Sequence, residues 1–237
     1  KLTVSFRAPE NMEITTSVDP SSAFMINVTA KATYETLFKI TWGDVPNEVP
    51  ASFLEGETVK HTYAKSGDYT ITVVALSGGV ATTTVTKKIT IKVPIVLPLD
   101  FETVGQTYNF VNFGGGDASV IANPKPGTIN TSSKVGKMVK NAPEVWGGSL
   151  ISLSSPIDFS VNKIMRLKVY SPRVGAKVLL KVENAANNGI FFEKEVATTV
   201  ANQWQDLTFD FRTINTSNSY NNVVLIFDLG TPGNGSA

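Results

Sequence analysis

Short runs in which hydrophobic and polar residues alternate dominate the sequence. The clearest are rich in β-branched residues and lie between turn residues; they are 70–75, 82–93, 166–170, 177–183 and 223–227. A period of two puts successive side chains on opposite faces of a β-strand. No segment of about twelve residues keeps the i, i+3, i+4, i+7 pattern of an amphipathic helix between good caps. The pattern therefore predicts an all-β protein with almost no helix.

The segment 93–98 interrupts this pattern. It contains two prolines in an apolar run, and proline has no N–H to donate to a sheet ladder. At 237 residues the chain also exceeds the usual size of one domain, although one large β-barrel would fit the length. We therefore predict two domains, 1–95 and 96–237.

Composition excludes several kinds of chemistry. Lys and Arg number 21 against 20 Asp and Glu, so the net charge of +1 supplies no field to attract nucleic acid or an anionic membrane. With no Cys, disulfides, thiolate nucleophiles and Cys-bound zinc are ruled out. The single His, His61, would have to serve any Ser-His-Asp relay, and a metal site with several His ligands is impossible. No apolar run reaches the roughly 18 residues of a membrane span, so we expect no membrane insertion of this chain.

The first half carries a recognisable series of motifs. Trp42-Gly43-Asp44 ends an apolar strand, and His61-Thr62-Tyr63 precedes the run 67–73, which indicates a tight turn, a corner tyrosine and a long core strand. These residues resemble the polycystic-kidney-disease (PKD) domain over about 30–95, with Val45 where that family usually has Gly. The resemblance implies an immunoglobulin-like β-sandwich that serves as a spacer and performs no chemistry.

His61 and Asp44 are also the right residue types for a catalytic or metal-binding pair. No third ligand or nucleophile lies near them in the sequence. We therefore expect both side chains to hold turns, and Trp42 to fill core.

The second half resembles another family. The segments Lys168-Val-Tyr-Ser-Pro172, Lys181-Val-Glu-Asn184 and Trp204 through Phe211 are similar to carbohydrate-binding modules of the family 4/9/22 type, and more narrowly to C-terminal modules of Bacteroidota surface glycan-binding proteins and laminarinases. The resemblance implies a β-jelly-roll that binds a β-glucan of laminarin (β-1,3-glucan) type without cleaving it. It also implies an extracellular, cell-surface location, with outer-membrane anchoring through an upstream segment, since residue 1 is not Met.

Neutral sugars are held by aromatic rings against their C–H faces and by a few polar groups. Trp146 precedes Gly147-Gly148, small residues that leave a ring accessible, so it is either a sugar platform or core. Tyr108 and Phe113 either flank such a platform or pack in the core. Trp204 opens the alternating strand that holds Phe209, and the family resemblance implies that it is core.

A polar row is predicted on the strand 166–170. Alternation sends Leu167 and Val169 to the core, and it places Arg166, Lys168 and Tyr170 together on the other face. That row either lines a groove or is merely solvated. The strand 177–183 has a similar row with an exposed Leu179, and Asn184, after that strand, is a further candidate for hydrogen bonding to a sugar.

Acidic residues offer one route to catalysis and one to a metal. Glu193 and Glu195 lie on one strand face, about 6.5–7 Å apart, a spacing that glycosidases also use. The intervening Lys194 and the lack of an E-x-D-x-x-E motif favour ordinary strand charges, so we do not predict an enzyme. The family resemblance implies Glu102 as a ligand of a structural Ca²⁺.

The resemblance also predicts an open sheet edge. The sequence stops before the aromatic strand with paired Asp that the family normally has, which would let a second copy pair with the edge as a dimer. Two other functional hypotheses stay open, namely accessory modules of a secreted glycoside hydrolase and a structural or adhesive stalk.

Overall fold

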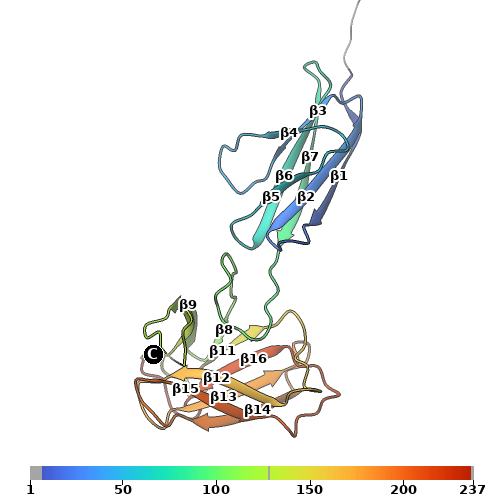
Figure 1. Ribbon diagram of the computed structural model, residues 1–237. Coiled ribbons are helices and arrows are strands. Elements are labelled where there is room, and N and C mark those ends of the chain that lie inside the picture. Colours follow the sequence, from blue (N-terminus) through green and yellow to red (C-terminus); the bar gives the residue numbers. More distant parts are fainter. Residues whose placement is uncertain (1–6, 128, 236–237) are drawn as a thin grey trace, which may run out of the picture. The chain divides into compact units, whose positions relative to one another are not determined.

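The computed structural model describes residues 7–127 and 129–235, and it shows β-strands joined by turns (Figure 1). No helix occurs in these residues, so none is long and apolar enough to cross a membrane. Each of the five runs predicted as strands forms one. The predicted all-β fold class is confirmed.

The chain divides into two compact units. Unit 1 comprises Lys1–Val93 and Val104–Thr107, and unit 2 comprises Pro94–Thr103 and Tyr108–Ala237. The short segment Val104–Thr107 joins unit 1 because Ser66 N donates to Gly105 O at 3.1 Å. A side chain at Gly105 would meet Ala64 O at 2.4 Å, and its φ of +75° is also one that glycine favours. The predicted boundary after residue 95 does not account for Val104–Thr107, which lies beyond that boundary in the sequence and belongs to unit 1.

Unit 1 contains a three-stranded and a four-stranded antiparallel sheet. The first has the order β1-β2-β5, which are Glu10–Val18, Met25–Thr33 and Val59–Thr62. The second has the order β4-β3-β6-β7, which are Ala51–Phe53, Leu37–Thr41, Gly67–Leu76 and Thr82–Ile91.

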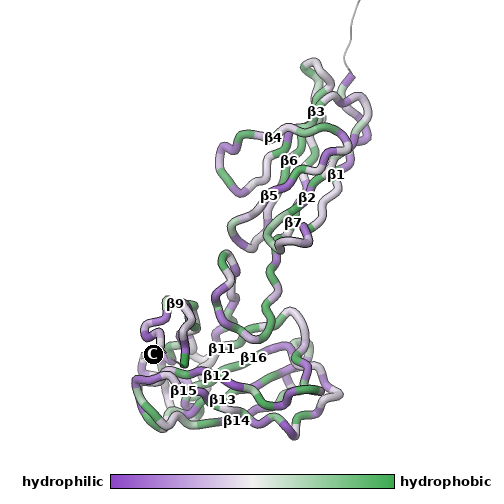
Figure 2. Tube along the Cα trace, viewed as in Figure 1, coloured by the Kyte–Doolittle hydropathy of each residue, from purple (hydrophilic) through white to green (hydrophobic). Residues whose placement is uncertain are grey.

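The core of unit 1 comes from alternate positions of these strands, such as Val28 of β2, Ile40 of β3 and Ile71 of β6. Figure 2 shows the mixture of hydrophobic and hydrophilic positions along the strands that this alternation produces. Apolar side chains removed from water in this way are the main favourable term in folding.

The predicted turn residues of unit 1 form one cluster. The Tyr63 hydroxyl is buried and donates to Trp42 O at 3.0 Å. The His61 ring stacks on Trp42 at 4.8 Å between centroids, and its Nε2 lies 2.8 Å from Asp44 Oδ2. These contacts confirm that His61 and Asp44 hold turns and that Trp42 fills core.

Unit 2 contains a five-stranded sheet, a two-stranded sheet and a separate hairpin. The five-stranded sheet has the order β14-β13-β16-β11-β8, which are Phe191–Ala197, Lys177–Glu183, Asn222–Phe227, Gly148–Ser152 and Val111–Phe113. The other pairs are β12-β15, Ile164–Tyr170 with Trp204–Asp210, and β10-β9, Lys134–Lys140 with Gly116–Ala122.

The core of unit 2 lies between the five-stranded and the two-stranded sheet. Val178, Leu180 and Val182 of β13 pack with Leu207 and Phe209 of β15. Two antiparallel sheets that share one apolar layer are a β-sandwich. The predicted sandwich architecture is therefore present in unit 2.

The last strand, β16, lies in the middle of the five-stranded sheet, and β14 and β8 form its edges. On β14, Glu193 and Glu195 point to the same face. A symmetric antiparallel pairing of β14 with a second copy would set these carboxylates against one another, and opposed like charges destabilise a sheet. The predicted dimer remains a prediction, and the charges of this edge oppose it.

We expect Tyr63→Phe to destabilise unit 1, because it removes a buried donor from the Trp42 carbonyl. The local free energy of unfolding should fall by about 1–2 kcal/mol. Hydrogen–deuterium exchange of peptides from β2 and β6 in the whole chain measures this value. Tyr34→Phe, whose ring is 49% exposed, is the control and should change it by less than about 0.5 kcal/mol. Equal protection from exchange in the two variants would mean that the hydrogen bond of the Tyr63 hydroxyl does not stabilise unit 1.

Candidate binding face

The five-stranded sheet of unit 2 has one face in the core and one face turned away from it, which we call the outer face. Because opposed residues of an antiparallel sheet point the same way, the strand register assigns outer-face residues in rows across the sheet. One row consists of Phe113, Gly148, Ile226, Leu179 and Glu195, and another of Ser152, Asn222, Glu183 and Phe191.

The first row ends in an aromatic pair, Phe113 and Trp146, which we call the aromatic end. Trp146 lies in the loop before β11, and its side chain is 46% exposed. The two rings are nearly parallel, at 11°, with centroids 6.1 Å apart. The indole also lies against Gly114, where an added Cβ would meet it at 2.5 Å. The ring is thus fixed by packing and still open to solvent.

The other row ends in a network of polar groups around an exposed ring, which we call the polar end. Lys181 Nζ lies 2.9 Å from Glu183 Oε2 and 4.4 Å from the centroid of Phe191, which is 48% exposed. Asn222 Nδ2 donates to Glu183 Oε1 at 3.4 Å, and the Ser152 hydroxyl donates to Asn222 Oδ1 at 2.8 Å. Glu183 and Asn222 are themselves buried, so the groups of this network that reach solvent are the Ser152 hydroxyl, the Lys181 ammonium and the Phe191 ring.

Between the two ends, β13 and β16 each contribute a buried apolar side chain to the outer face. Leu179 and Val224 are buried, although Leu179 was predicted to be exposed. That prediction was wrong because Leu179 lies in register between Ile226 and Glu195, and the Glu195 carboxylate reaches across to Lys177 Nζ at 3.1 Å. Because Leu179 is buried, it offers a sugar no exposed apolar surface between the two ends.

The structure places the predicted aromatic residues in two clusters. Phe113 stacks beside Trp146, whereas Tyr108 packs edge-on against Phe101, with centroids 5.0 Å apart. The Phe101 ring lies over Gly136, where an added Cβ would meet it at 3.1 Å. Tyr108 therefore packs with Phe101, and only Phe113 belongs to the aromatic end.

The predicted polar row belongs to the other sheet. Arg166 and Lys168 are exposed on β12, and Tyr170 lies on the same face, while Leu167 and Val169 pack in the core, as predicted. Because β12 pairs with β15 and not with the five-stranded sheet, these three residues do not join the outer face that ends at Trp146.

Trp204 was predicted to fill core, and this is wrong. Its ring is partly exposed and lies edge-on to Tyr170 at 5.6 Å, and its Nε1 donates to Lys125 O at 2.7 Å. The reason is the alternation of β15, because Trp204 lies three positions before Leu207 and five before Phe209, so it points to the face opposite these core residues. Trp204 thus faces away from the core.

Asn184 lies just beyond Glu183, next to the polar end. Its Oδ1 accepts hydrogen bonds from Ala186 N at 2.9 Å and Asn187 N at 3.0 Å, and its Nδ2 donates to Ser219 O at 3.0 Å. The Asn184 amide thus stabilises its own loop, and a sugar would have to compete with these hydrogen bonds.

Glu102, the predicted calcium ligand, is used within unit 2. Its Oε2 accepts from the Ser133 hydroxyl at 2.5 Å and its Oε1 from Lys134 N at 2.8 Å, and these bonds lower the pKa of the carboxyl. In the described parts of the chain, no group of three or more His, Asp or Glu could hold a metal ion. The calcium ion at Glu102 stays a prediction, and the two hydrogen bonds show only that both carboxylate oxygens already have partners within unit 2.

One depression, of about 300 Å³, lies at the edge between β14 and β15. The residues that line it are Lys194, Glu195, Val196, Thr208, Asp210 and Thr213. It contains no aromatic ring, so it offers a sugar hydrogen bonds without an apolar surface. The outer face combines both.

Sequence reasoning missed the polar end of this face. Phe191 and Glu183 were not considered together, although the pairing of β13 with β14 sets them opposite one another. The only available signal was the shared alternation of two strands, which does not reveal which strands are neighbours.

Comparisons with known proteins add little to this geometry. No protein-family model and no curated protein sequence matches the chain. One solved structure, described as carbohydrate-binding modules of the β-sandwich superfamily with promiscuous specificity, is 12% identical. It is similar over 98% of this chain and 95% of that chain, with a TM-score of 0.39. A likeness at this level carries no argument about function.

We expect the stabilisation by Glu102 to depend on pH. Because its folded-state pKa lies below the ordinary value of 4.5, the carboxylate stabilises unit 2 fully above about pH 4.5. That stabilisation is lost as the pH falls through the folded-state pKa. Glu102→Gln should therefore lower the thermal midpoint of unit 2 at pH 7, and the difference from wild type should shrink in acid.

Differential scanning calorimetry from pH 7 to pH 3 measures this difference. Glu144→Gln, at an exposed position of the same unit, is the matched control and should stay close to wild type throughout. A difference between wild type and Glu102→Gln that stays constant over the whole pH range would exclude ionisation as its cause.

Proposed function

We propose that unit 2 binds a neutral polysaccharide through the outer face and does not cleave it. The observation that carries this proposal is the Trp146 ring, fixed against Gly114 and Phe113 and 46% exposed. An immobile open indole gives the C–H face of a sugar a surface at little cost in side-chain entropy.

The polar end supplies the second half of the site. The buried Glu183 and Asn222 bond to Lys181 and Ser152, so a sugar hydroxyl would meet an ammonium and a hydroxyl whose positions are already set. Strand spacing and rise place Phe191 about 23 Å from Phe113 on the opposite edge strand. A face of this length suits a chain of several sugar residues rather than a single one.

The specific ligand we propose is a β-glucan of laminarin type. Support comes from the resemblance of the second half to carbohydrate-binding modules and from the net charge of +1, which does not favour a polyanionic glycan. In the same proposal, unit 1 is a spacer, and the chain captures glucan at the cell surface, held to the outer membrane by an upstream segment.

Trp146→Ala should remove most of the binding. We expect affinity for laminarin to fall at least about thirtyfold, equivalent to about 2 kcal/mol, because the main apolar contact is lost. Affinity electrophoresis in laminarin gels, followed by isothermal titration calorimetry, measures this loss. Tyr34→Ala removes a ring of similar exposure, 49%, from unit 1 and is the matched control.

Retardation of Trp146→Ala equal to wild type would remove this residue from the site. Wild-type migration unaffected by laminarin, barley β-glucan and xylan alike would contradict glycan binding altogether and would favour a structural stalk.

Phe191→Ala should affect long ligands more than short ones. Because Phe191 lies at the far end of the outer face from Trp146, only a longer chain can reach both rings. We expect a loss of about fivefold, near 1 kcal/mol, for laminarihexaose and no change for laminaribiose. Calorimetric titration with both oligosaccharides tests this. An equal loss for both ligands would mean that Phe191 does not lie at a distant part of the site.

A further inference from the structure

Lys140, the last residue of β10, is a lysine that the fold has enclosed. The residue is 8% exposed, and Gly233 of the C-terminal segment passes so close that an added Cβ would meet Lys140 O at 2.2 Å. Gly235 N donates to the same carbonyl at 3.0 Å. Burial lowers the pKa of the ammonium, and the Asp228 carboxylate acts against that shift.

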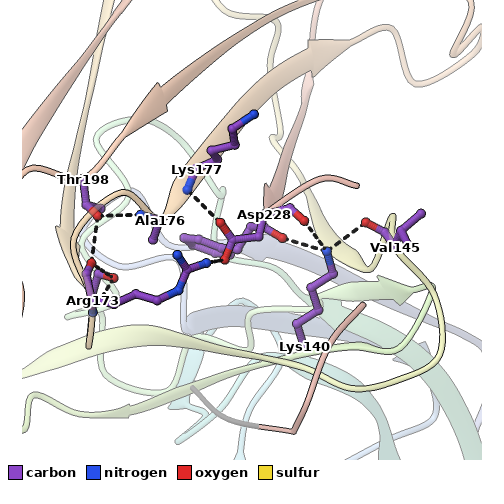
Figure 3. A network of polar contacts seen from close by, with 9 residues as sticks. Lys140, Val145, Arg173, Ala176, Lys177, Thr198 and Asp228 are labelled. Carbon is purple, nitrogen blue, oxygen red and sulfur yellow. Dashed lines mark hydrogen bonds and ion pairs between the residues drawn. The ribbon is translucent and has the colours of Figure 1, made fainter. Parts of the chain in front are cut away.

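All three protons of this ammonium have acceptors. Nζ lies 2.8 Å from each of the carbonyl oxygens of Val145, Phe227 and Asp228 (Figure 3). Hydrogen bonds with a charged donor are roughly twice as strong as neutral ones. The Lys140 side chain therefore joins two segments that lie far apart in the sequence, the loop before β11 and the end of β16.

The loop segment it holds is the one that carries the indole. Val145 immediately precedes Trp146, and its carbonyl also accepts from Gly230 N at 3.1 Å. At the start of the same loop, Asn141 N donates to Gly115 O at 2.8 Å. Two points of the loop, both before Trp146 in the sequence, are thereby tied down.

The other segment is held just as firmly. The Asp228 carboxylate pairs with the Arg173 guanidinium and accepts from Lys177 N at 2.9 Å. The Thr198 hydroxyl donates to Arg173 O at 2.9 Å and accepts from Ala176 N at 3.0 Å. Figure 3 shows this network running from Thr198 to Val145. Lys140 is thus anchored to a fixed point of the sheet.

A buried cation is costly unless its partners offset the desolvation, and an apolar side chain of similar size would often serve the fold as well. What an apolar side chain could not do is hold the Val145 carbonyl. We infer that Lys140 is a positioning residue of the sugar site, which holds Val145 so that the Trp146 indole stays against Gly114 and Phe113. Its consequence for sugar binding rests on the proposed function of Trp146.

The test follows the ring directly. The chain contains three tryptophans, and with 5-fluorotryptophan each gives one ¹⁹F resonance, that of Trp146 being assigned with Trp146→Phe. In Lys140→Met we expect the Trp146 resonance to shift or broaden, while those of Trp42 and Trp204 stay in place. Laminarin affinity should fall about tenfold. Lys137→Met, the same change at an exposed position of β10, is the matched control and should leave all three resonances unchanged.

An unchanged Trp146 resonance in Lys140→Met contradicts the inference. A displaced resonance supports it even if no variant, wild type included, binds laminarin, and that second result would count only against the proposed function. Should Lys140→Met fail to fold, Lys140→Arg is measured in the same way. Arginine keeps the charge but cannot place three donors at one point, so an unchanged Trp146 resonance there also contradicts the inference.

Discussion

The division of side chains between the two faces of the five-stranded sheet is the constraint on which the rest of unit 2 depends. On β13, Val178, Leu180 and Val182 enter the core, so Lys181 and Glu183 must face the other way. A shift of one residue in the pairing would exchange the two sets. The burial that stabilises the sandwich therefore also determines which groups a ligand can meet.

This constraint explains what sequence reasoning could and could not find. Strands with strong alternation, such as β6 and β7, were predictable from local pattern alone, as was the orientation of Leu167 and Val169. The error at Trp204 arose because the family resemblance placed it in the core, although its position in the alternation indicates the opposite face. Residue type favours burial, but strand alternation determines the direction in which a side chain points.

The remainder depends on contacts between distant segments, which no local pattern contains. Phe113 and Trp146 stack because β8 pairs with β11. Lys140 Nζ donates to Phe227 O, which lies 87 residues later in the sequence. Gly114, which follows Phe113, lets the indole approach the backbone, and this role is visible only once the two segments lie together.

The charges of the outer face bear on the kind of ligand it accepts. Lys177 pairs with Glu195 and Lys181 with Glu183, so each ammonium already has a carboxylate partner. A polyanionic glycan would have to displace these partners and would meet the exposed Glu193 as well. A neutral chain needs no such exchange, because its hydroxyls can both donate to the carboxylates and accept from the amide and ammonium groups. Under the proposed function, the paired charges thus favour neutral sugars by excluding charged ones, while the indole supplies most of the attraction.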